Sequence, residues 1–328
     1  RQMCIRDRPS VMDLFGITPH HYIYAGPAGY KHFHLLLSSL ISNVNNTTIT
    51  EINSVHACIL FKGHGKDRSS DRSYRTISSC PFIAKSLDMY VRNLNIKLWN
   101  KNSPETQFQH EGSSHELAAL LLTESIQHSL FTLKQPAFIL YLDAKSAFDV
   151  VLRELLIKNL YNCGTNGHSL LYLNNRLESR KTFIEWDGQV MGPIDDERGV
   201  EQGGVSSSEL YRIFGAEQLI TAQNSGFGIP LGNSTNHQHI ISAIGQADDT
   251  ALISNSILKL HHLLLLTSIF CQKYQVTLCA EKTKLQVYFT KEMEKIVEYS
   301  IKTNQIKVDG VTIELVNTAE HVGVLRST

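Results

Sequence analysis

The sequence has no excess of either charge: Lys and Arg together number 31, and Asp and Glu together also number 31. No overall basic field therefore indicates a polyanionic partner, and any nucleic-acid site has to be a local patch. The six cysteines lack C-x-x-C spacing, which argues against a disulfide scaffold and a zinc ribbon. The fifteen histidines form no well-spaced zinc quartet with them. A reducing, intracellular compartment is favoured.

Long apolar segments are also lacking. The most apolar run, Leu260–Phe270, is too short and too interrupted to span a bilayer, and the N-terminal "RQMCIRDRPS" lacks the apolar core of a signal peptide. Residues 1–8 resemble a translated sequencing adaptor and are set aside as an artefact, and residues 325–328 end abruptly. We therefore expect a fragment of a longer product.

The remaining composition, 42% hydrophobic and 19% charged, is ordinary for a soluble globular chain of one large or two ordinary domains. Apolar periodicity predicts a helix at His32–Val44, a second one with an apolar stripe, and a third one that begins after Ser113 or Ser114. The stripe consists of Ile83, Leu87, Tyr90, Val91 and Leu94.

A basic loop follows a predicted strand at His56–Phe61. Its "GHGK" is not a P-loop, because Asp67 stands where Ser or Thr should hold magnesium. A solvated loop and a phosphate-binding loop both stay open. The cations are Lys62, Lys66, Arg68, Arg72 and Arg75.

A buried strand is predicted at Ala137–Leu142, because a continuous apolar run is typical of a strand covered on both faces. Asp143 follows directly, at the strand end where ligand sites form in sheet proteins. Helical periodicity then begins near Ser146 and ends at Gly164. Taken alone, Asp143 is better explained as a helix cap.

The next segments are a hairpin and a glycine loop. "TFIEWDGQVMG" predicts two strands joined by Asp187-Gly188, and the polar triplet 195–197 that follows is interpreted as solvated surface. Gly203-Gly204 precede a helix whose start carries a Ser206–Glu209 capping box. Paired glycines allow close approach of a ligand, although a tight turn also uses them.

A second acidic feature lies in "HIISAIGQADDTALIS", which predicts strand, turn, strand with Asp248 and Asp249 at the tip. Two aspartates in a turn are ordinarily a solvated hairpin tip. If this hairpin lies beside the strand that ends in Asp143, three carboxylates converge. Such oxygen ligands suit magnesium, and two ions stabilise the oxygens of an in-line phosphoryl displacement.

In this order, the segments resemble the palm motifs of reverse transcriptases: strand-Asp-x-x-x-Ala-Phe-Asp, Gln-Gly before a helix, Ala-Asp-Asp in a hairpin, and "AEKTKLQVYF". The upstream segments "SYRTISSCPFIAKSLD" and "TQFQHEGSSHELAALLL" are similar to further blocks of the family. The chain resembles, from His56 to Val324, the reverse transcriptase domain of a non-LTR (LINE-like) retrotransposon.

The resemblance implies an α+β fold, a right-hand polymerase with fingers and a palm whose antiparallel sheet packs on helices, and with the thumb absent or truncated. Residues 9–50 would be an N-terminal helical extension, 51–135 the fingers and 136–324 the palm, which includes a fingers-like hairpin at 180–192. The palm motifs would lie at 137–149, 199–215, 240–254 and 278–289.

The resemblance also implies roles. Asp143 and Asp248 would be the principal ligands of two Mg²⁺ or Mn²⁺ ions, with Asp249 beside them, and Lys282 would lie near the departing pyrophosphate. Phe148 matches the steric gate that selects deoxynucleotides. The residues expected to bind nucleotide are Arg75, Ala144, Phe148, Gln202, Gly203, Lys62 and Lys66.

The implied partners are an RNA template, a DNA primer and deoxynucleoside triphosphates, without a membrane, in a retroelement ribonucleoprotein of the nucleus and cytoplasm. The sequence departs from the family pattern at Gln246, where an aromatic residue is usual, at Cys279, where Asn is usual, and at Thr76, where Pro is usual. The upstream block keeps Gln107 or Gln109 but lacks its Gly-Phe-Arg core.

Two functions stay open: an active RNA-directed DNA polymerase, and a decayed or co-opted fold that binds nucleic acid without synthesis. A two-metal nuclease would leave Phe148 and Gln202-Gly203 without a role.

Overall fold

The computed structural model describes residues 13, 16–43, 52–63, 65, 67–70, 73–110, 112–178, 180–186, 189–232 and 239–328. The chain divides into two compact units, the first formed by residues 1–101 and 151–210 and the second by residues 102–150 and 211–328. The adaptor-like residues 1–8 and the predicted turn at Asp187-Gly188 lie outside the described residues. Among those described, no helix is long and apolar enough to cross a membrane.

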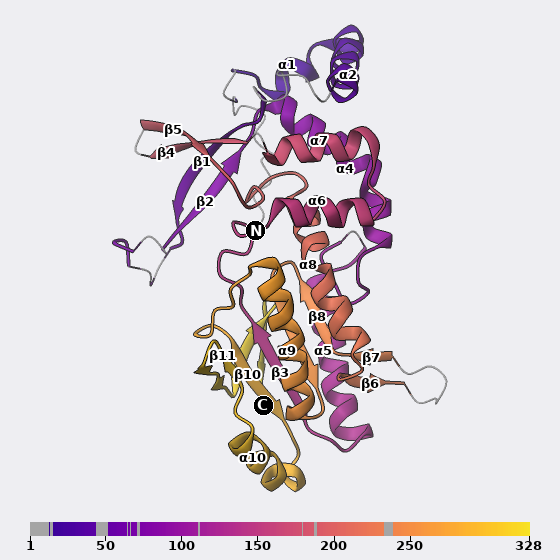
Figure 1. Cartoon of the computed structure of the whole chain (residues 1–328), viewed down its shortest axis with the longest axis vertical. Helices are drawn as coiled ribbons and strands as arrows, with labels where there is room; N and C mark the ends of the chain where they lie inside the picture. The colour runs from indigo at the N-terminus through magenta and orange to yellow at the C-terminus, as the bar shows by residue number, and fades with distance from the viewer. Residues whose placement is uncertain are drawn as a thin grey trace. The chain divides into compact units, whose positions relative to one another are not determined.

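The first unit combines helices with a sheet whose strand order is β2-β1-β4-β5 (Figure 1). β1 is antiparallel to β2 and parallel to β4, and β4 and β5 form the predicted hairpin, with Trp186 opposite Gln189. Its elements are α1 (Pro19–Ile23), α2 (Gly26–Ser42), β1 (Ser54–Phe61), β2 (Tyr74–Ser79), α4 (Phe82–Lys101), α6 (Arg153–Asn162), α7 (Gly167–Glu178), β4 (Lys181–Trp186) and β5 (Gln189–Asp195).

The predicted apolar stripe on α4 is only partly correct. Leu87 and Val91 are buried, but Tyr90 and Leu94 are 38% and 59% exposed. The buried face of the helix also carries polar residues, among them Asp88, which makes ion-pair contacts. Those polar positions interrupt the apolar pattern. Periodicity alone therefore predicted a buried face that is rotated about the helix axis from the one observed.

The second unit is built on a five-stranded sheet with the order β13-β10-β3-β9-β8. Helix α8 (Ser207–Asn224) begins in the first unit and continues into the second. The other elements are α5 (His115–Gln127), η3 (His128–Thr132), β3 (Ala137–Leu142), β6 (Ile229–Leu231), β7 (His239–Ile241), β8 (Ala243–Gln246), β9 (Asp249–Ser254), α9 (Ile257–Tyr274), β10 (Lys284–Tyr288), η4 (Lys291–Met293), α10 (Glu294–Thr303), β11 (Lys307–Val308), β12 (Val311–Thr312), β13 (Glu314–Leu315), β14 (Thr318–His321) and β15 (Val324–Ser327).

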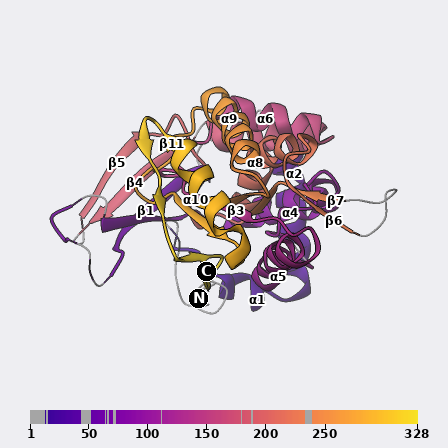
Figure 2. The same cartoon turned by 90° about the horizontal axis from the view of Figure 1, so that it is seen from below.

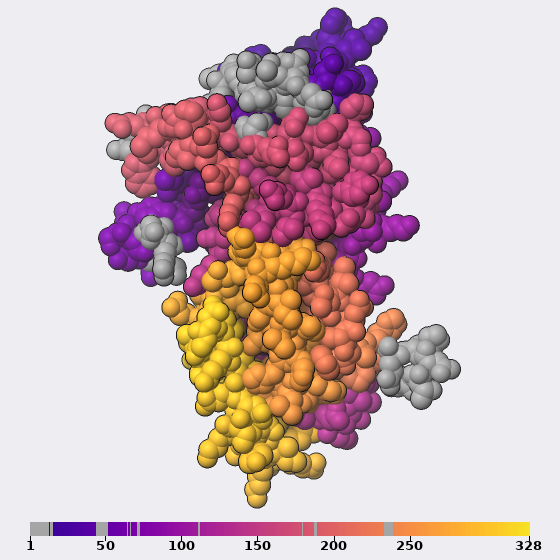
Figure 3. Space-filling view, viewed as in Figure 1, coloured from indigo at the N-terminus to yellow at the C-terminus, as the bar shows by residue number. Residues whose placement is uncertain are grey.

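Helices cover both faces of this sheet, which explains why every residue of β3 is buried. Phe138 and Leu140 pack in a core with residues of α8 and α9, whereas Ile139 packs in a second core with residues of α5. Figure 2 shows α8 and α9 on one side of β3 and α5 on the other. The outer side of α9 reaches the molecular surface (Figure 3), where Leu258 and Leu265 are exposed. The buried strand predicted at Ala137–Leu142 is confirmed.

The segment after β3 departs from the prediction. Helix α6 begins at Arg153, whereas helical spacing predicted a start near Ser146. Ser146 has a positive φ of 49°, and its carbonyl accepts hydrogen bonds from the amides of Asp149 and Val150 at 2.8 and 3.2 Å. The helix does end as predicted, with Gly164 at φ 94°. The apolar residues of this segment are buried by neighbouring elements, so their spacing mimics helical periodicity.

The N-cap prediction for α5 is confirmed, because the Ser114 hydroxyl accepts the amide of Leu117 at 3.3 Å. The capping box predicted for α8 is wrong. The Glu209 carboxylate accepts a hydrogen bond from Arg92 Nε at 2.7 Å, and the Ser206 hydroxyl donates to the Asp88 carbonyl at 3.5 Å. Both side chains therefore tie α8 to α4 instead of closing a reciprocal cap.

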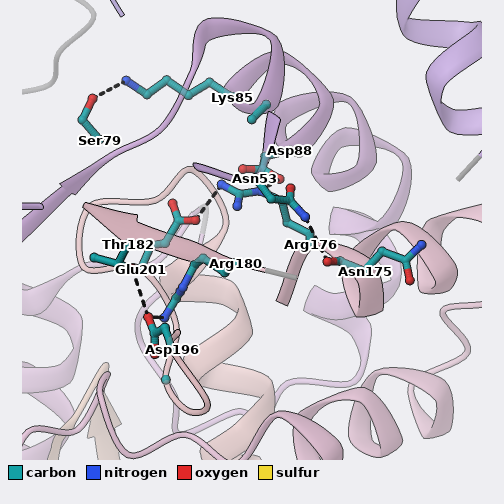
Figure 4. A network of polar contacts seen from close by, with 12 residues as sticks. Asn53, Ser79, Lys85, Asp88, Asn175, Arg176, Arg180, Thr182, Asp196 and Glu201 are labelled. Atoms are coloured by element: carbon teal, nitrogen blue, oxygen red, sulfur yellow. Dashed lines mark hydrogen bonds and ion pairs between the residues drawn. The ribbon is translucent and has the colours of Figure 1, made fainter. Parts of the chain in front are cut away.

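The interpretation of the acidic triplet 195–197 as solvated surface is corrected at Asp196, whereas Asp195 and Glu197 are exposed as expected. Asp196 is paired with two buried arginines, Arg153 at 3.1 Å and Arg180, and Figure 4 shows its contact with Arg180. A neighbouring network contains Arg176, which contacts Glu201 at 2.6 Å and Asp88 at 3.4 Å. The triplet was interpreted as solvated because a sequence pattern does not reveal arginines that are distant along the chain.

Candidate active site

The three predicted aspartates come to one end of the sheet of the second unit. Asp143 directly follows β3, and β3 pairs with β9 so that Leu142 lies opposite Thr250. Asp249, the first residue of β9, therefore begins at the edge where β3 ends. Asp248 lies in the turn between β8 and β9, where Gln246 pairs with Asp249. The register of the antiparallel strands alone thus brings the carboxylates together.

A backbone link fixes the segment that carries Asp143. The Cys279 amide donates to the Asp143 carbonyl at 2.7 Å, and the Lys145 amide donates to the Thr277 carbonyl at 2.8 Å. The Lys282 amide donates to the Cys279 carbonyl at 3.1 Å, which forms a turn. This turn brings the Lys282 ammonium to 3.1 and 3.3 Å from the two Asp143 carboxylate oxygens.

The three carboxylates repel one another. Burial raises the pKa of Asp249 to about 6, with further increases from Asp248 and Asp143 and an opposing effect of His115. Burial and Asp143 likewise raise the pKa of Asp248, opposed by a backbone hydrogen bond and by Lys282. Carboxylates whose pKa values are raised by burial and by like-charged neighbours are a physical signature of a site that favours a bound cation or proton.

The donor chemistry of this cluster fits magnesium or manganese. All of its side-chain donors are carboxylate oxygens, the ligands that these hard cations prefer, and Mg²⁺ commonly takes only one or two carboxylates together with substrate phosphates. Across the described ranges, no group of three or more His, Cys, Asp or Glu side chains is spaced to hold an ion by itself. The aspartates therefore fit a site that substrate phosphates complete.

Phe148, the predicted gate, lies on the turn segment between Asp143 and α6. Its ring stacks on Tyr211 of α8, with ring centroids 5.0 Å apart and an interplanar angle of 26°. Tyr211 is 8% exposed, and burial together with Asp248 raises its pKa. Sequence reasoning overlooked Tyr211, although an aromatic residue one helical turn inside the helix that follows the glycine loop was a visible signal.

Gln246, which replaces the usual aromatic residue, is 9% exposed and precedes the aspartate turn. Its side-chain oxygen has no hydrogen-bond partner among the described residues. The strand edge beside it is covered by the upstream block, because the Phe108 amide donates to the Gly245 carbonyl at 2.8 Å. A Cβ at Gly245 would lie 2.7 Å from Leu219 Cδ1, so the Leu219 side chain would have to shift to admit any other residue there. Sequence reasoning did not place Gln107 beside this strand, where it bridges Gly245.

The other predicted nucleotide-binding residues belong to the first unit. Arg75 is exposed on β2, and the Ser78 amide of the same strand donates to the Gln202 carbonyl at 3.0 Å. Gly203 has a φ of 102°, and a Cβ there would meet the Ser78 carbonyl oxygen at 3.4 Å. The Gln202-Gly203 loop therefore contacts β2, the strand that carries Arg75.

Two further sequence-predicted residues complete the set. Lys62 is exposed just after β1, where its amide donates to the Ser73 carbonyl at 2.8 Å. Lys66 lies outside the described residues. The carboxylates, Lys282, Ala144 and Phe148 belong to the second unit.

Comparison with solved structures finds a similar fold. A truncated apo telomerase from Candida tropicalis matches with a TM-score of 0.53 and 13% sequence identity, over 85% of this chain and 55% of that chain. The chain thus spans about half the length of the telomerase that it matches. A search of the curated proteins found none that matches this sequence.

The telomerase match shows a similar fold only, whereas a family model identifies the family. The model, described as reverse transcriptase (RNA-dependent DNA polymerase), matches residues 65–313, which is more than half of the chain. It confirms the resemblance to reverse transcriptases drawn from the ordered motifs, and together with the telomerase match it supports the expected α+β fold, with an antiparallel sheet packed on helices. The chain belongs to the reverse transcriptase family.

Proposed function

We propose that the chain is the RNA-directed DNA polymerase domain of a non-LTR retrotransposon, which adds deoxynucleotides to a primer 3′-hydroxyl along an RNA template. The observation that supports this most is the convergence of Asp143, Asp248 and Asp249 at one sheet end, where burial and the neighbouring carboxylates raise the pKa of Asp248 and Asp249. The same proposal places the protein in a retroelement ribonucleoprotein of the nucleus and cytoplasm.

In this proposal, Asp143, Asp248 and Asp249 hold two Mg²⁺ or Mn²⁺ ions. When bound, the ions neutralise charge on the attacking and leaving oxygens of an in-line displacement. The primer 3′-hydroxyl attacks the α-phosphate, and pyrophosphate leaves. The Lys282 ammonium, 67% exposed beside Asp143, stabilises the departing pyrophosphate or donates a proton to it.

The nucleotide is held and selected by other side chains. The Phe148 ring clashes with a ribose 2′-hydroxyl and so favours deoxynucleotides, while the Ala144 carbonyl contributes a further oxygen. The residues proposed to bind the triphosphate and line the nucleotide pocket are Arg75, Gln202, Gly203, Lys62 and Lys66.

A second function, nucleic-acid binding without synthesis, is supported by Gln246. Its buried carbonyl oxygen has no partner among the described residues, directly before the aspartate turn, where the family usually has an aromatic side chain. An unpartnered buried polar atom destabilises its surroundings. A polar residue in place of the aromatic one, next to the proposed primer end, is the kind of substitution expected in a chain that is no longer under selection for catalysis.

Primer extension on poly(rA)/oligo(dT) with dTTP and Mn²⁺ tests the proposal. Wild type is expected to extend the primer, Asp248→Asn to lose extension, and the exposed Asp309→Asn, in the β11–β12 turn, to behave as wild type. Folded wild type that binds the duplex in a gel shift without extending it favours the second function. Cleavage of labelled RNA or DNA in the absence of nucleotides would contradict both.

A further inference from the structure

The gate residue Phe148 lies on a segment that cannot fix its ring by itself. The segment is a series of turns, with Ser146 at a positive φ, instead of a helix or strand. Phe148 is only half-buried, and its neighbour Asp149 is exposed. A ring that selects between sugars by a clash has to resist displacement, so its orientation must come from a contact elsewhere.

Tyr211 supplies that contact. Its ring is stacked against Phe148 at a centroid distance of 5.0 Å, which is within the favourable range for offset aromatic pairs. Tyr211 stands on α8 and is buried, whereas Phe148 is only partly buried. The rigid helix thereby supports the irregular segment.

Behind Tyr211, an aromatic cluster leaves little room for the ring to retreat. Phe214 lies 6.2 Å from Tyr211 and is packed edge-on against Tyr274 at 4.9 Å. Tyr274 stacks on Phe270 at 4.4 Å, and its hydroxyl donates to Glu217 at 2.6 Å, which ties α9 back to α8. The cluster thus holds Tyr211 in place from behind.

Tyr211 also belongs to the surroundings of the aspartates. It lines a cavity of about 30 Å³ together with Ala144 and Asp248, which is room for about one water molecule. Asp248 and Asp249 both raise the pKa of Tyr211, in addition to the effect of burial. The side chain is therefore a neutral phenol between the gate and the carboxylates.

We infer that Tyr211 is a positioning residue for sugar selection, which acts by holding the Phe148 ring and does not itself touch the nucleotide. This inference rests on the proposed function, because Phe148 selects a sugar only if the chain polymerises nucleotides. The ring of Tyr211, not its hydroxyl, carries the effect. Tyr211→Phe is therefore the conservative variant that retains selection, and Tyr211→Leu the variant that loosens it.

The experiment compares dGTP with GTP on poly(rC)/oligo(dG) with Mn²⁺, because the two nucleotides differ only in the 2′-hydroxyl. For Tyr211→Leu, the ratio of GTP to dGTP efficiency should rise roughly three- to tenfold, the size of one aromatic pair contact. Phe148→Ala should raise the ratio at least as much. The double variant should match Phe148→Ala alone, because the two residues act through one ring.

The matched control is Phe227→Leu, a partly buried aromatic residue of the same unit whose ring packs against His262 at a centroid distance of 4.9 Å. It should lower thermal stability and leave the nucleotide ratio unchanged. Tyr211→Met, which fills the site with a flexible side chain, replaces Tyr211→Leu if the latter does not fold.

Equal loss of dGTP and GTP incorporation in Tyr211→Leu, or a ratio that rises further in the double variant, would overturn the inference. Failure of folded wild type to incorporate dGTP overturns the proposed function instead. In that case, a crystal structure of Tyr211→Leu decides the positioning role: a displaced or disordered Phe148 ring supports it, and an unmoved ring refutes it.

Discussion

Two clusters of charge in this chain are built in opposite ways. In the first unit, Arg176 sits between Asp88 and Glu201, and all three side chains are at most 10% exposed (Figure 4). In the second unit, three aspartates lie at one sheet end, and Lys282, 67% exposed, is within ion-pair distance of only Asp143 among them. Buried charges are ordinarily paired, and in the first cluster each buried carboxylate contacts a cation that the chain itself supplies.

The second cluster gathers three carboxylates with one lysine, and burial together with the neighbouring carboxylates raises the pKa of Asp248 and Asp249. Folding alone gives no reason to gather like charges at a sheet end, because each raises the cost of ionising the others. Cation contacts therefore distinguish a network that the chain supplies by itself from a cluster that, in the proposed function, binds metal ions, even though both are built from ordinary acidic residues.

The largest expected effect is on metal binding. Asp248→Asn removes one charge from the unbalanced cluster and should abolish primer extension, a loss of roughly a thousandfold if it removes several kcal/mol of charge stabilisation. Isothermal titration calorimetry with Mn²⁺ should show weaker binding than in wild type. Asp196→Asn, in the balanced region, serves as the counterpart and should leave Mn²⁺ binding unchanged. Equal Mn²⁺ affinity of Asp248→Asn and wild type would contradict the proposal that the aspartate cluster binds metal.

The next largest effect is on stability in the first unit. Arg176→Met leaves Asp88 and Glu201 buried without their cation, and should lower the free energy of unfolding by about 3–5 kcal/mol. Lys273→Met, which breaks an ion pair with Glu217 that is 50% and 41% exposed, should cost no more than about 1 kcal/mol. Urea unfolding measures both. Comparable losses in the two variants would show that the buried network is not what stabilises this unit.

A smaller effect concerns the unpartnered amide beside the aspartates. Gln246→Met removes a buried oxygen that lacks a partner among the described residues, and should raise the free energy of unfolding by about 1 kcal/mol. Gln107→Met is the paired comparison, because the Gln107 oxygen accepts the Gln109 amide at 3.2 Å and its loss should destabilise the chain. Urea unfolding of both variants provides the check, and stabilisation by neither would contradict the expectation for Gln246.

The smallest effect is a dependence of stability on pH. The pKa of Asp249 is raised to about 6 from an ordinary value of 3.8, so the folded chain retains a proton that the unfolded chain has released. This contribution to stability is present at acidic pH and is lost as the pH rises through about 6. Although part of the Asp249 carboxyl is shielded by its neighbours, the residue as a whole is exposed, so water screens the effect to about 1 kcal/mol or less.

Urea unfolding at pH 5 and pH 7 measures it, with Asp249→Asn as the comparison. Wild type should lose more stability than the variant between the two values. A variant that shows the same pH dependence as wild type would assign the effect to other groups.

The site was predictable where local pattern and strand register agree. Asp143 follows an apolar run, and Asp248 lies between two β-prone runs, so the antiparallel pairing of β3 with β9 was sufficient to bring them together. The prediction failed where long-range contacts decide. The start of α6 was misplaced because Phe148 satisfies helical spacing while it stacks on Tyr211.

The same limit applies to charges. Asp196 was interpreted as solvated because the sequence does not show that Arg153 and Arg180 are folded against it. The role of Tyr211 was missed for a similar reason, since nothing in its local sequence reveals which ring it meets. Patterns therefore predicted which backbone positions carry the carboxylates, but not which side chains distant along the chain surround them.

The backbone link between residues 143–145 and 277–279 has a consequence for sequence divergence. Its hydrogen bonds join amides to carbonyls, so the Cys279 amide holds Asp143 whatever side chain stands at position 279. Replacement of the family's usual Asn by Cys therefore leaves this part of the site intact. The side chain at such a position can change during evolution while the backbone geometry around Asp143 is retained. The arrangement of the site can therefore be conserved after sequence similarity is lost.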